Sequence, residues 1–254
     1  MQKRFLLGER GLVVAALVGV IVCAWAYLVR ASLDMHGRME GPAAWMMEAR
    51  WDARYALLVF VMWAVMMVGM MLPGALPTIL LFRRAIHSDS QVRAPVARTL
   101  TFASGYVLAW SVFSVAATLL QWGLAQVALL SPMMMSVSPW LGGAILIAAG
   151  VYQWTPLKTV CVTHCRSPLA FLMQHWRPGT PSALRVGLRH GLYCVGCCWV
   201  LMLLLFFGGV MNLSWIAAIT AFVLAEKLTP YGVQAGRLSG VALVLAGLLV
   251  LIIA

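Results

Sequence analysis

The sequence predicts an all-α fold, a polytopic transmembrane helix bundle of about seven spans with the N-terminus in the cytoplasm and the C-terminus outside. Of the 254 residues, 63% are hydrophobic and only 10% are charged. Apolar runs close to the ~20 residues that cross a bilayer recur along the whole chain. Basic residues gather between alternate runs, as they do on the cytoplasmic side of membrane proteins. We therefore expect a single integral membrane domain over residues 1–254.

The expected spans follow the apolar runs in order. They cover residues 11–29, 55–82, 99–123, 139–155, 190–210, 213–227 and 238–254. The first run is long for a signal peptide and no small-residue cleavage pattern follows it, so we expect it to remain as an anchor. The second contains Pro73 and Pro77, which free backbone carbonyls and predict a kink. The segment 156–189 contains several prolines, which predict two short helical pieces with a break.

The distribution of charge predicts the orientation and the surroundings of the chain. A net charge of +11 could indicate nucleic-acid binding, but the positions of the charges argue against such a partner. With the N-terminus inside, the outer segment 30–54 pairs four arginines with four acidic residues, and the basic excess lies on the inner side. We expect a lipid bilayer as the surroundings and no nucleic acid. The sequence leaves the oligomeric state open.

Cysteines and a histidine form one stripe on the fifth expected span. Around a helix, His190, Cys194, Cys197 and Cys198 fall within an arc of about 100°. The expected start of this span at residue 190 places them near its inner end, where a helix N-terminus favours thiolates. Small buried cysteines also pack well between helices. Three on one stripe beside a histidine favour a metal site over packing.

A second cluster, Cys161, His164 and Cys165, follows the fourth expected span. In a helix these residues share a face through their i, i+3 and i+4 spacing. Both clusters are expected at the same inner face, so they can meet there. Thiolates and imidazoles bind soft or borderline metals, copper(I) first and zinc as the alternative. The spacing is not that of a zinc finger, and His164 could instead reach toward lipid headgroups.

Methionine is abundant, with 16 copies. On the second span Met62, Met66 and Met70 stack at i, i+4 and i+8, with Met67 and Met71 beside them. Thioethers select Cu(I) over hard ions, although a methionine stripe also serves as adaptable core packing. We expect Met62, Met66 and Met70 to line a path for a soft metal. Further methionines lie in the expected outer segments: Met35, Met39, Met46, Met47, Met133, Met134 and Met135.

Two further features bear on function. Glu226 and Lys227 close the sixth span, where an ionisable pair is either a functional group or an interfacial anchor. The chain contains no glycine-rich phosphate loop, no His-Glu-x-x-His pair and no Ser/His/Asp set in a plausible context. This argues against an enzyme without excluding one.

Several motifs resemble a bacterial family of integral membrane proteins that are predicted to bind metal. The resemblance rests on the methionine-rich stretch 62–73, the Cys-x-x-His-Cys stretch 161–165, the His-Gly-x-x-Cys-x-Gly-Cys-Cys-Trp stretch 190–199 and the pair 226–227. Gly74 departs from the serine expected after the proline, which affects no metal ligand. The resemblance implies a multi-pass protein of the bacterial inner membrane that binds metal, but it specifies neither the metal nor an activity.

The leading hypothesis is a protein that handles, transports or delivers Cu(I), with a metal chaperone or an assembly factor of a metalloenzyme as partner. Its metal ligands would be Cys161, His164, Cys165, His190, Cys194, Cys197, Cys198, Met62, Met66 and Met70. The Cys-x-x-Cys pair at 194 and 197 also fits a membrane thiol–disulfide oxidoreductase. A membrane assembly subunit with a structural zinc is a third hypothesis.

Overall fold

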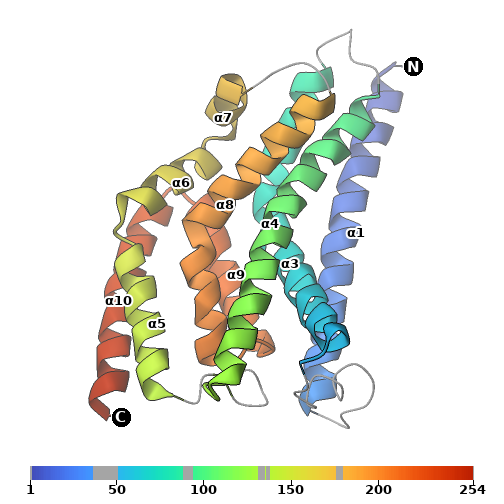
Figure 1. Cartoon of the computed structure of the whole chain (residues 1–254). Coiled ribbons are helices and arrows are strands. Elements are labelled where there is room, and N and C mark those ends of the chain that lie inside the picture. Colours follow the sequence, from blue (N-terminus) through green and yellow to red (C-terminus); the bar gives the residue numbers. More distant parts are fainter. Residues whose placement is uncertain are drawn as a thin grey trace.

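The structure, a computed structural model, describes residues 2–36, 51–87, 94–130, 135, 138–175 and 180–253. Every regular element among them is a helix (Figure 1). The helices are α1 (Gln2–His36), α3 (Ala53–His87), α4 (Pro95–Gln126), α5 (Pro139–Tyr152), α6 (Pro156–Arg166), α7 (Pro168–His175), α8 (Thr180–Gly208), α9 (Leu213–Leu228) and α10 (Gly232–Ile253). The predicted all-α fold class is confirmed.

Five of these helices, α1, α3, α4, α8 and α10, are long and apolar enough to cross a membrane. A sixth crossing results if α5 and α6, which meet at a bend of 64°, are taken together. The difference from the expected seven is α9, whose 16 residues fall short of the ~20 that a bilayer requires. α1 begins at one end of the bundle and α10 finishes at the other (Figure 1). The exact count and the orientation remain predictions.

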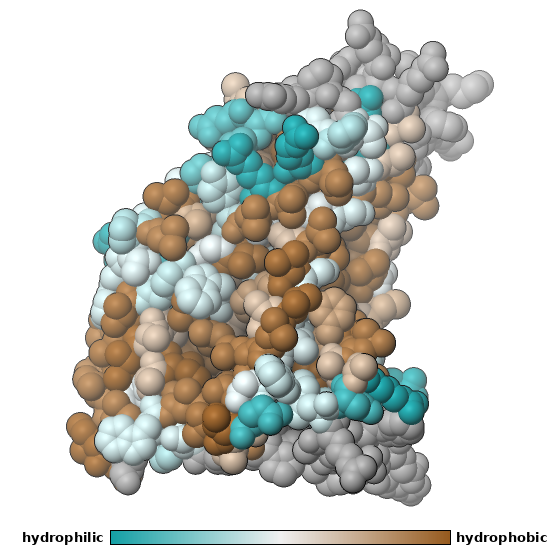
Figure 2. Space-filling model, viewed as in Figure 1, coloured by the Kyte–Doolittle hydropathy of each residue, from teal (hydrophilic) through white to brown (hydrophobic). Residues whose placement is uncertain are grey.

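The surface agrees with a membrane setting. Figure 2 shows one face on which hydrophobic residues form a broad band between hydrophilic patches at the two ends of the bundle. Large apolar side chains on α4 point outward, and Val112 and Leu119 are 62% and 59% exposed. In water such a surface would be costly, whereas lipid tails cover it without penalty.

The two prolines expected to kink α3 do not interrupt the helix. α3 continues as one helix through Pro73 and Pro77. Pro73 has no N–H to offer the carbonyl of Gly69, four residues earlier. The indole of Trp25 on α1 donates a hydrogen bond to that carbonyl at 3.1 Å. The freed backbone group is therefore satisfied by a neighbouring helix, as a membrane interior requires.

α4 and α8 cross with their backbones in contact, because glycines form the crossing. A Cβ on Gly187 would overlap the carbonyl of Phe102, and one on Gly105 would overlap the carbonyl of Leu184. One turn further along α8, a Cβ on Gly191 would lie 2.6 Å from the Cβ of Ala109. Small residues at i and i+4 allow such close approach in membrane bundles. This crossing holds the centre of α8 against α4.

The predicted start of the fifth span was wrong by ten residues, with a consequence for the cysteines. α8 begins at Thr180, so Cys194 lies at the middle of the helix instead of near its end. The segment 156–189 does contain two short helices, α6 and α7, as expected, but its last ten residues belong to α8. The favourable field of a helix N-terminus is confined to the first turn, so it cannot act on these thiols.

Candidate metal centre

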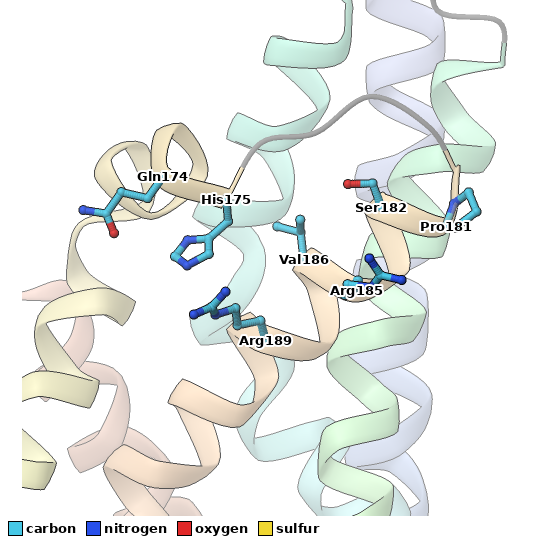
Figure 3. A pocket seen from close by; sticks show the side chains of 7 residues that line it. All are labelled: Gln174, His175, Pro181, Ser182, Arg185, Val186 and Arg189. Carbon is cyan, nitrogen blue, oxygen red and sulfur yellow. The ribbon is translucent and has the colours of Figure 1, made fainter.

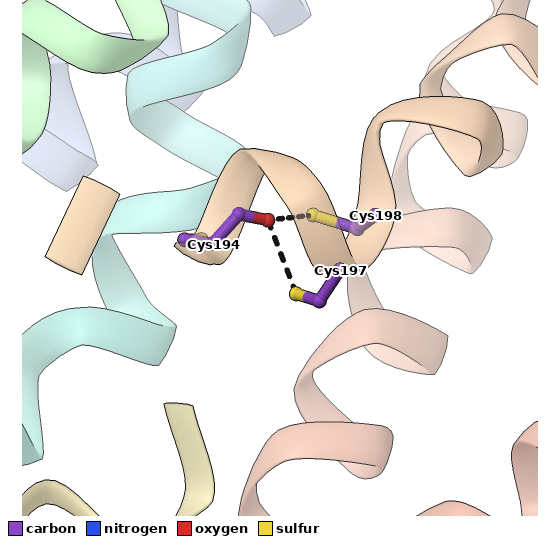
Figure 4. Close-up of side chains that lie close together, drawn as sticks. All are labelled: Cys194, Cys197 and Cys198. Atoms are coloured by element: carbon purple, nitrogen blue, oxygen red, sulfur yellow. Dashed lines mark hydrogen bonds between the residues drawn. The ribbon is translucent and has the colours of Figure 1, made fainter. Parts of the chain in front are cut away.

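Three cysteines of α8 form a compact buried group. The sulfurs of Cys194, Cys197 and Cys198 lie within 4.8 Å of one another, and each residue is at most 2% exposed. The thiols of Cys197 and Cys198 donate hydrogen bonds to the carbonyl of Cys194, at 3.1 and 2.9 Å (Figure 4). The i, i+3, i+4 spacing of the sequence therefore produces the shared stripe that was predicted.

The second cysteine cluster meets the first, also as predicted. α6 packs against α8, and the half-buried Cys165 side chain lies beside the thiols of Cys194 and Cys197. Cys161 lies against Gly196, whose missing side chain makes room for the sulfur: a Cβ there would be 2.8 Å from the Cys161 Sγ. Two helices thus bring five sulfurs to one place, of which the α8 trio forms the centre.

One methionine joins this group, and it is not among the three that were predicted. The Sδ of Met71 lies 3.8 Å from the Sγ of Cys198. Met62, Met66 and Met70 are fully buried in the core along a neighbouring stripe of α3. Met71 stood in the same sequence run, and only the docking of α3 against α8 distinguishes it from its neighbours.

Tyr106 of α4 and Lys227 of α9 complete the surroundings. The Tyr106 hydroxyl lies 3.0 Å from the Cys194 Sγ and donates a hydrogen bond to the carbonyl of Met71 at 2.9 Å. The Lys227 ammonium lies 2.9 Å from the Cys194 Sγ and 3.8 Å from both the Cys198 Sγ and the Met71 Sδ. Tyr106 was missed by the sequence analysis, because an isolated tyrosine in an apolar span gives no signal.

Lys227 supplies the positive charge that the helix N-terminus does not. The residue is 7% exposed, and a buried cation at hydrogen-bond distance stabilises negative charge on a sulfur. Its neighbour Glu226 does not neutralise it, because the Glu226 carboxylate forms an ion pair with Lys158 of α6 at 2.8 Å. Of the two earlier hypotheses for this pair, a functional group or an interfacial anchor, the first fits Lys227. Glu226 fits neither, because it forms a buried ion pair with Lys158.

The Lys158–Glu226 pair carries the first stability prediction. Both residues are at most 4% exposed, so Glu226→Gln leaves the Lys158 ammonium buried without its counter-charge. Breaking such a pair typically costs about 3–5 kcal/mol. We expect a marked fall in the midpoint of thermal unfolding of the purified protein in detergent. The double variant Lys158→Met/Glu226→Gln should recover most of that loss, and equal instability of the two variants would contradict the explanation.

The two predicted histidines lie outside the sulfur group. His190, 2% exposed, sits one turn before Cys194 among the rings of Phe102, Tyr106 and Phe171. Its Nδ1 is buried and has no hydrogen-bond partner. His164 is half-buried and stacks on Tyr193 at 4.2 Å, with its Nδ1 bonded to the Val160 carbonyl. His190 therefore packs among aromatic rings beside the centre, and His164 packs on Tyr193.

Most of the methionines expected on the outer side lie in segments that the structure does not describe. The predicted outer methionines Met39, Met46, Met47, Met133 and Met134 lie outside the described residues, as do the side chains of Met35 and His36. Met135 is described and 42% exposed. A methionine-rich mouth on the outer side therefore stays a prediction.

The donor set fits a soft metal. It consists of buried thiols and a thioether, ligands that favour Cu(I) and, for the thiols, Zn²⁺. Among the residues that the structure describes, no aspartate or glutamate belongs to the α8 trio. Hard cations such as Mg²⁺ and Ca²⁺ require oxygen ligands and are a poor match.

Comparison with known proteins gives one match. The model of the family PpoB2, described as a copper chaperone, matches residues 60–250. This range contains every residue of the sulfur group, together with Tyr106 and Lys227. No curated protein and no solved structure shows significant similarity to the chain.

Proposed function

This chain belongs to the PpoB2 family of copper chaperones, and from that premise we propose that its cargo is Cu(I), held by the α8 cysteines. The observation that carries the proposal is the set of three buried sulfurs within 4.8 Å of one another. Cu(I) accepts two or three soft ligands, and thiolates are the strongest that a protein offers. Met71 would add a thioether from α3, and Cys165 a further thiol from α6.

The charges of the centre suit a monovalent cargo. Cu(I) bound by two thiolates carries one negative charge, which is costly in a buried site. The Lys227 ammonium at 2.9 Å from the Cys194 Sγ offsets that charge. A divalent ion bound by two thiolates beside the same ammonium would give the site a net charge of about +1. Two bound thiolates therefore balance Cu(I) beside Lys227, whereas Zn²⁺ would need all three.

The setting of this chemistry is also part of the proposal. The five apolar helices support a multi-pass membrane protein, and the charge distribution favours the bacterial cytoplasmic membrane with the N-terminus inside. There the protein would deliver Cu(I) to an acceptor, a metal chaperone or a metalloenzyme during its assembly. Transfer requires only exchange of one soft ligand for another, so the metal keeps its oxidation state throughout.

The first experiment is a metal analysis of the full-length protein purified in detergent, followed by anaerobic titration with Cu(I) against a chromogenic chelator. We expect about one copper per chain with an affinity that competes with the chelator. Zinc in place of copper, retained in the presence of chelator, would support a structural site and contradict the proposal. Reversible disulfide formation without any metal would instead support the thiol–disulfide oxidoreductase.

Met71 and Met66 give a matched test of which methionine touches the cargo. Met71→Leu conserves volume in the core but removes the thioether 3.8 Å from the Cys198 Sγ. We expect Cu(I) affinity to fall about tenfold, equivalent to about 1.4 kcal/mol. Met66→Leu, equally buried, should leave the affinity unchanged. Both affinities follow from the same chelator competition, and a larger effect of Met66→Leu would restore the original methionine hypothesis.

A further inference from the structure

A pocket of about 470 Å³ opens between α7 and the beginning of α8. It lies at the end of the bundle where α1 begins (Figure 1). Figure 3 shows the ring of His175 and the side chain of Arg189 extending into the same space between the two helices. The pocket is lined by Gln174, His175, Pro181, Ser182, Arg185, Val186 and Arg189. Its volume falls within the ~300–1,000 Å³ of small-molecule sites.

The residues that line the pocket favour a negatively charged ligand. Arg185 and Arg189 lie one turn apart on α8 and contribute two guanidinium groups, while none of the lining residues that the structure describes is acidic. Guanidinium groups bind carboxylates and phosphates through paired hydrogen bonds. Gln174 and Ser182 add neutral donors. The expected ligand is therefore an anionic molecule about as large as a short peptide, which a pocket of this volume can hold.

His175 gives the pocket a metal ligand in addition to its charge. Its Nδ1 lies 2.8 Å from the Phe171 carbonyl. A hydrogen bond from one ring nitrogen to a backbone carbonyl is the arrangement that orients metal-binding histidines, because it leaves the other nitrogen free to coordinate. Phosphate binding alone would not require this imidazole.

A short series of rings leads from the pocket to the metal centre. The ring of His175 lies 4.8 Å from that of Phe171, and Phe171 lies 5.2 Å from His190. His190 lies 5.7 Å from Tyr106, whose hydroxyl is 3.0 Å from the Cys194 Sγ. Phe171 is 1% exposed, so it separates the open pocket from the buried sulfurs. The Nδ1 of His190, the next ring in the series, is buried and has no hydrogen-bond partner.

We propose that this pocket is the loading site of the chaperone, where a small anionic Cu(I)–thiolate complex docks and passes Cu(I) through His175 and His190 to Cys194. The proposal rests on the function proposed above. The two guanidinium groups would repel free Cu⁺, so the copper must arrive with an anionic carrier. On the predicted orientation the pocket faces the cytoplasm, where thiol peptides such as glutathione are abundant.

The transfer is a ligand exchange without electron transfer. In the first step the Cu(I) bond to the carrier sulfur breaks as a bond to the His175 imidazole forms. In each later step the bond to the preceding ligand breaks as the next one forms, first from His175 to His190 and then from His190 to the Cys194 sulfur. Copper remains Cu(I) throughout, and no oxidant or reductant is needed. The carrier leaves as a thiolate, which takes up the proton released by the cysteine that binds the metal. His175 and His190 act on either side of Phe171, whose ring must turn aside for the ion to pass.

The test measures the rate of anaerobic loading of the full-length apo protein from two donors, the anionic Cu(I)–glutathione complex and the cationic Cu(I)–acetonitrile complex. Arg189→Gln should slow loading from glutathione about tenfold, the lower end of electrostatic effects on association, and should not slow loading from acetonitrile. Arg237→Gln on α10 is the matched control, because it removes one charge from an equally exposed arginine outside the pocket. It should change neither rate.

A second variant tests the imidazole. His175→Ala should slow loading from Cu(I)–glutathione while the final copper content stays that of the wild type, since the sulfur ligands are intact. Equal effects of Arg189→Gln and Arg237→Gln, or an unchanged rate in His175→Ala, would overturn the loading site and leave the sulfur centre standing. Failure of the wild type to bind copper from either donor would overturn the proposed function, and the loading site with it.

Discussion

Replacing Cys194 and Cys197 together with serine is expected to abolish copper binding. The two sulfurs belong to the trio within 4.8 Å, and Cys194 is also the one that lies at hydrogen-bond distance from Lys227 and Tyr106. The variant leaves Cys198 as the one sulfur of the trio, and a hydroxyl is a hard ligand that Cu(I) binds poorly. We expect copper content to fall from about one per chain to background.

Elemental analysis of the purified variant, beside the wild type, gives the readout. Cys23→Ser is the matched control, because Cys23 is an exposed cysteine on α1 outside both clusters. It should retain full copper content. Serine is close in size to cysteine, so thermal unfolding should show that both variants remain folded. Copper retained at wild-type level by the double variant would remove the α8 trio from the explanation.

Gly187→Ala is expected to separate α4 from α8 and to cost about 3 kcal/mol or more, above the usual range for overpacking. The new Cβ would overlap the Phe102 carbonyl, and backbone cannot move aside as a flexible side chain can. The separation would also draw Tyr106 away from Cys194, two turns further along α8. We therefore expect both a lower unfolding midpoint and a weaker Cu(I) affinity.

Gly123→Ala on α4 provides the comparison, since a Cβ there would meet nothing within 4 Å. Alanine has a higher helix propensity than glycine, so this variant should match or slightly exceed the stability of the wild type. Unfolding in detergent, followed by circular dichroism, distinguishes the two substitutions. If Gly187→Ala were as stable as Gly123→Ala, the close crossing of α4 and α8 would be contradicted.

Features that depend on local order along the chain were predictable. The apolar runs predicted the helices because hydrophobic length and helical hydrogen bonding are both properties of short segments. The stripe of Cys194, Cys197 and Cys198 followed from helical periodicity alone. Their meeting with Cys165 was also expected, because the fourth span was predicted to end, and the fifth to begin, on the same side of the membrane.

Predictions that depended on where a helix begins or ends were less accurate. The fifth span was predicted to begin at residue 190, because the prolines and charges before that residue predict a break in the helical structure. α8 begins earlier. The helix begins instead at Thr180. Pro181 fits the first turn, because the N–H that proline lacks would have no partner within the helix there. This error moved the cysteines to the end of a helix and assigned their charge stabilisation to the wrong group.

The sequence by itself therefore determined a helical membrane bundle with a cysteine-rich centre, because composition and periodicity act within single segments. Only the tertiary structure decided which methionine, which tyrosine and which cation belong to that centre. Met71 lies one residue from Met70, and Lys227 lies far along the chain from Cys194. Their positions relative to the sulfurs depend on how α3, α8 and α9 rotate against one another, and that rotation is set by close packing between helices rather than by any local pattern.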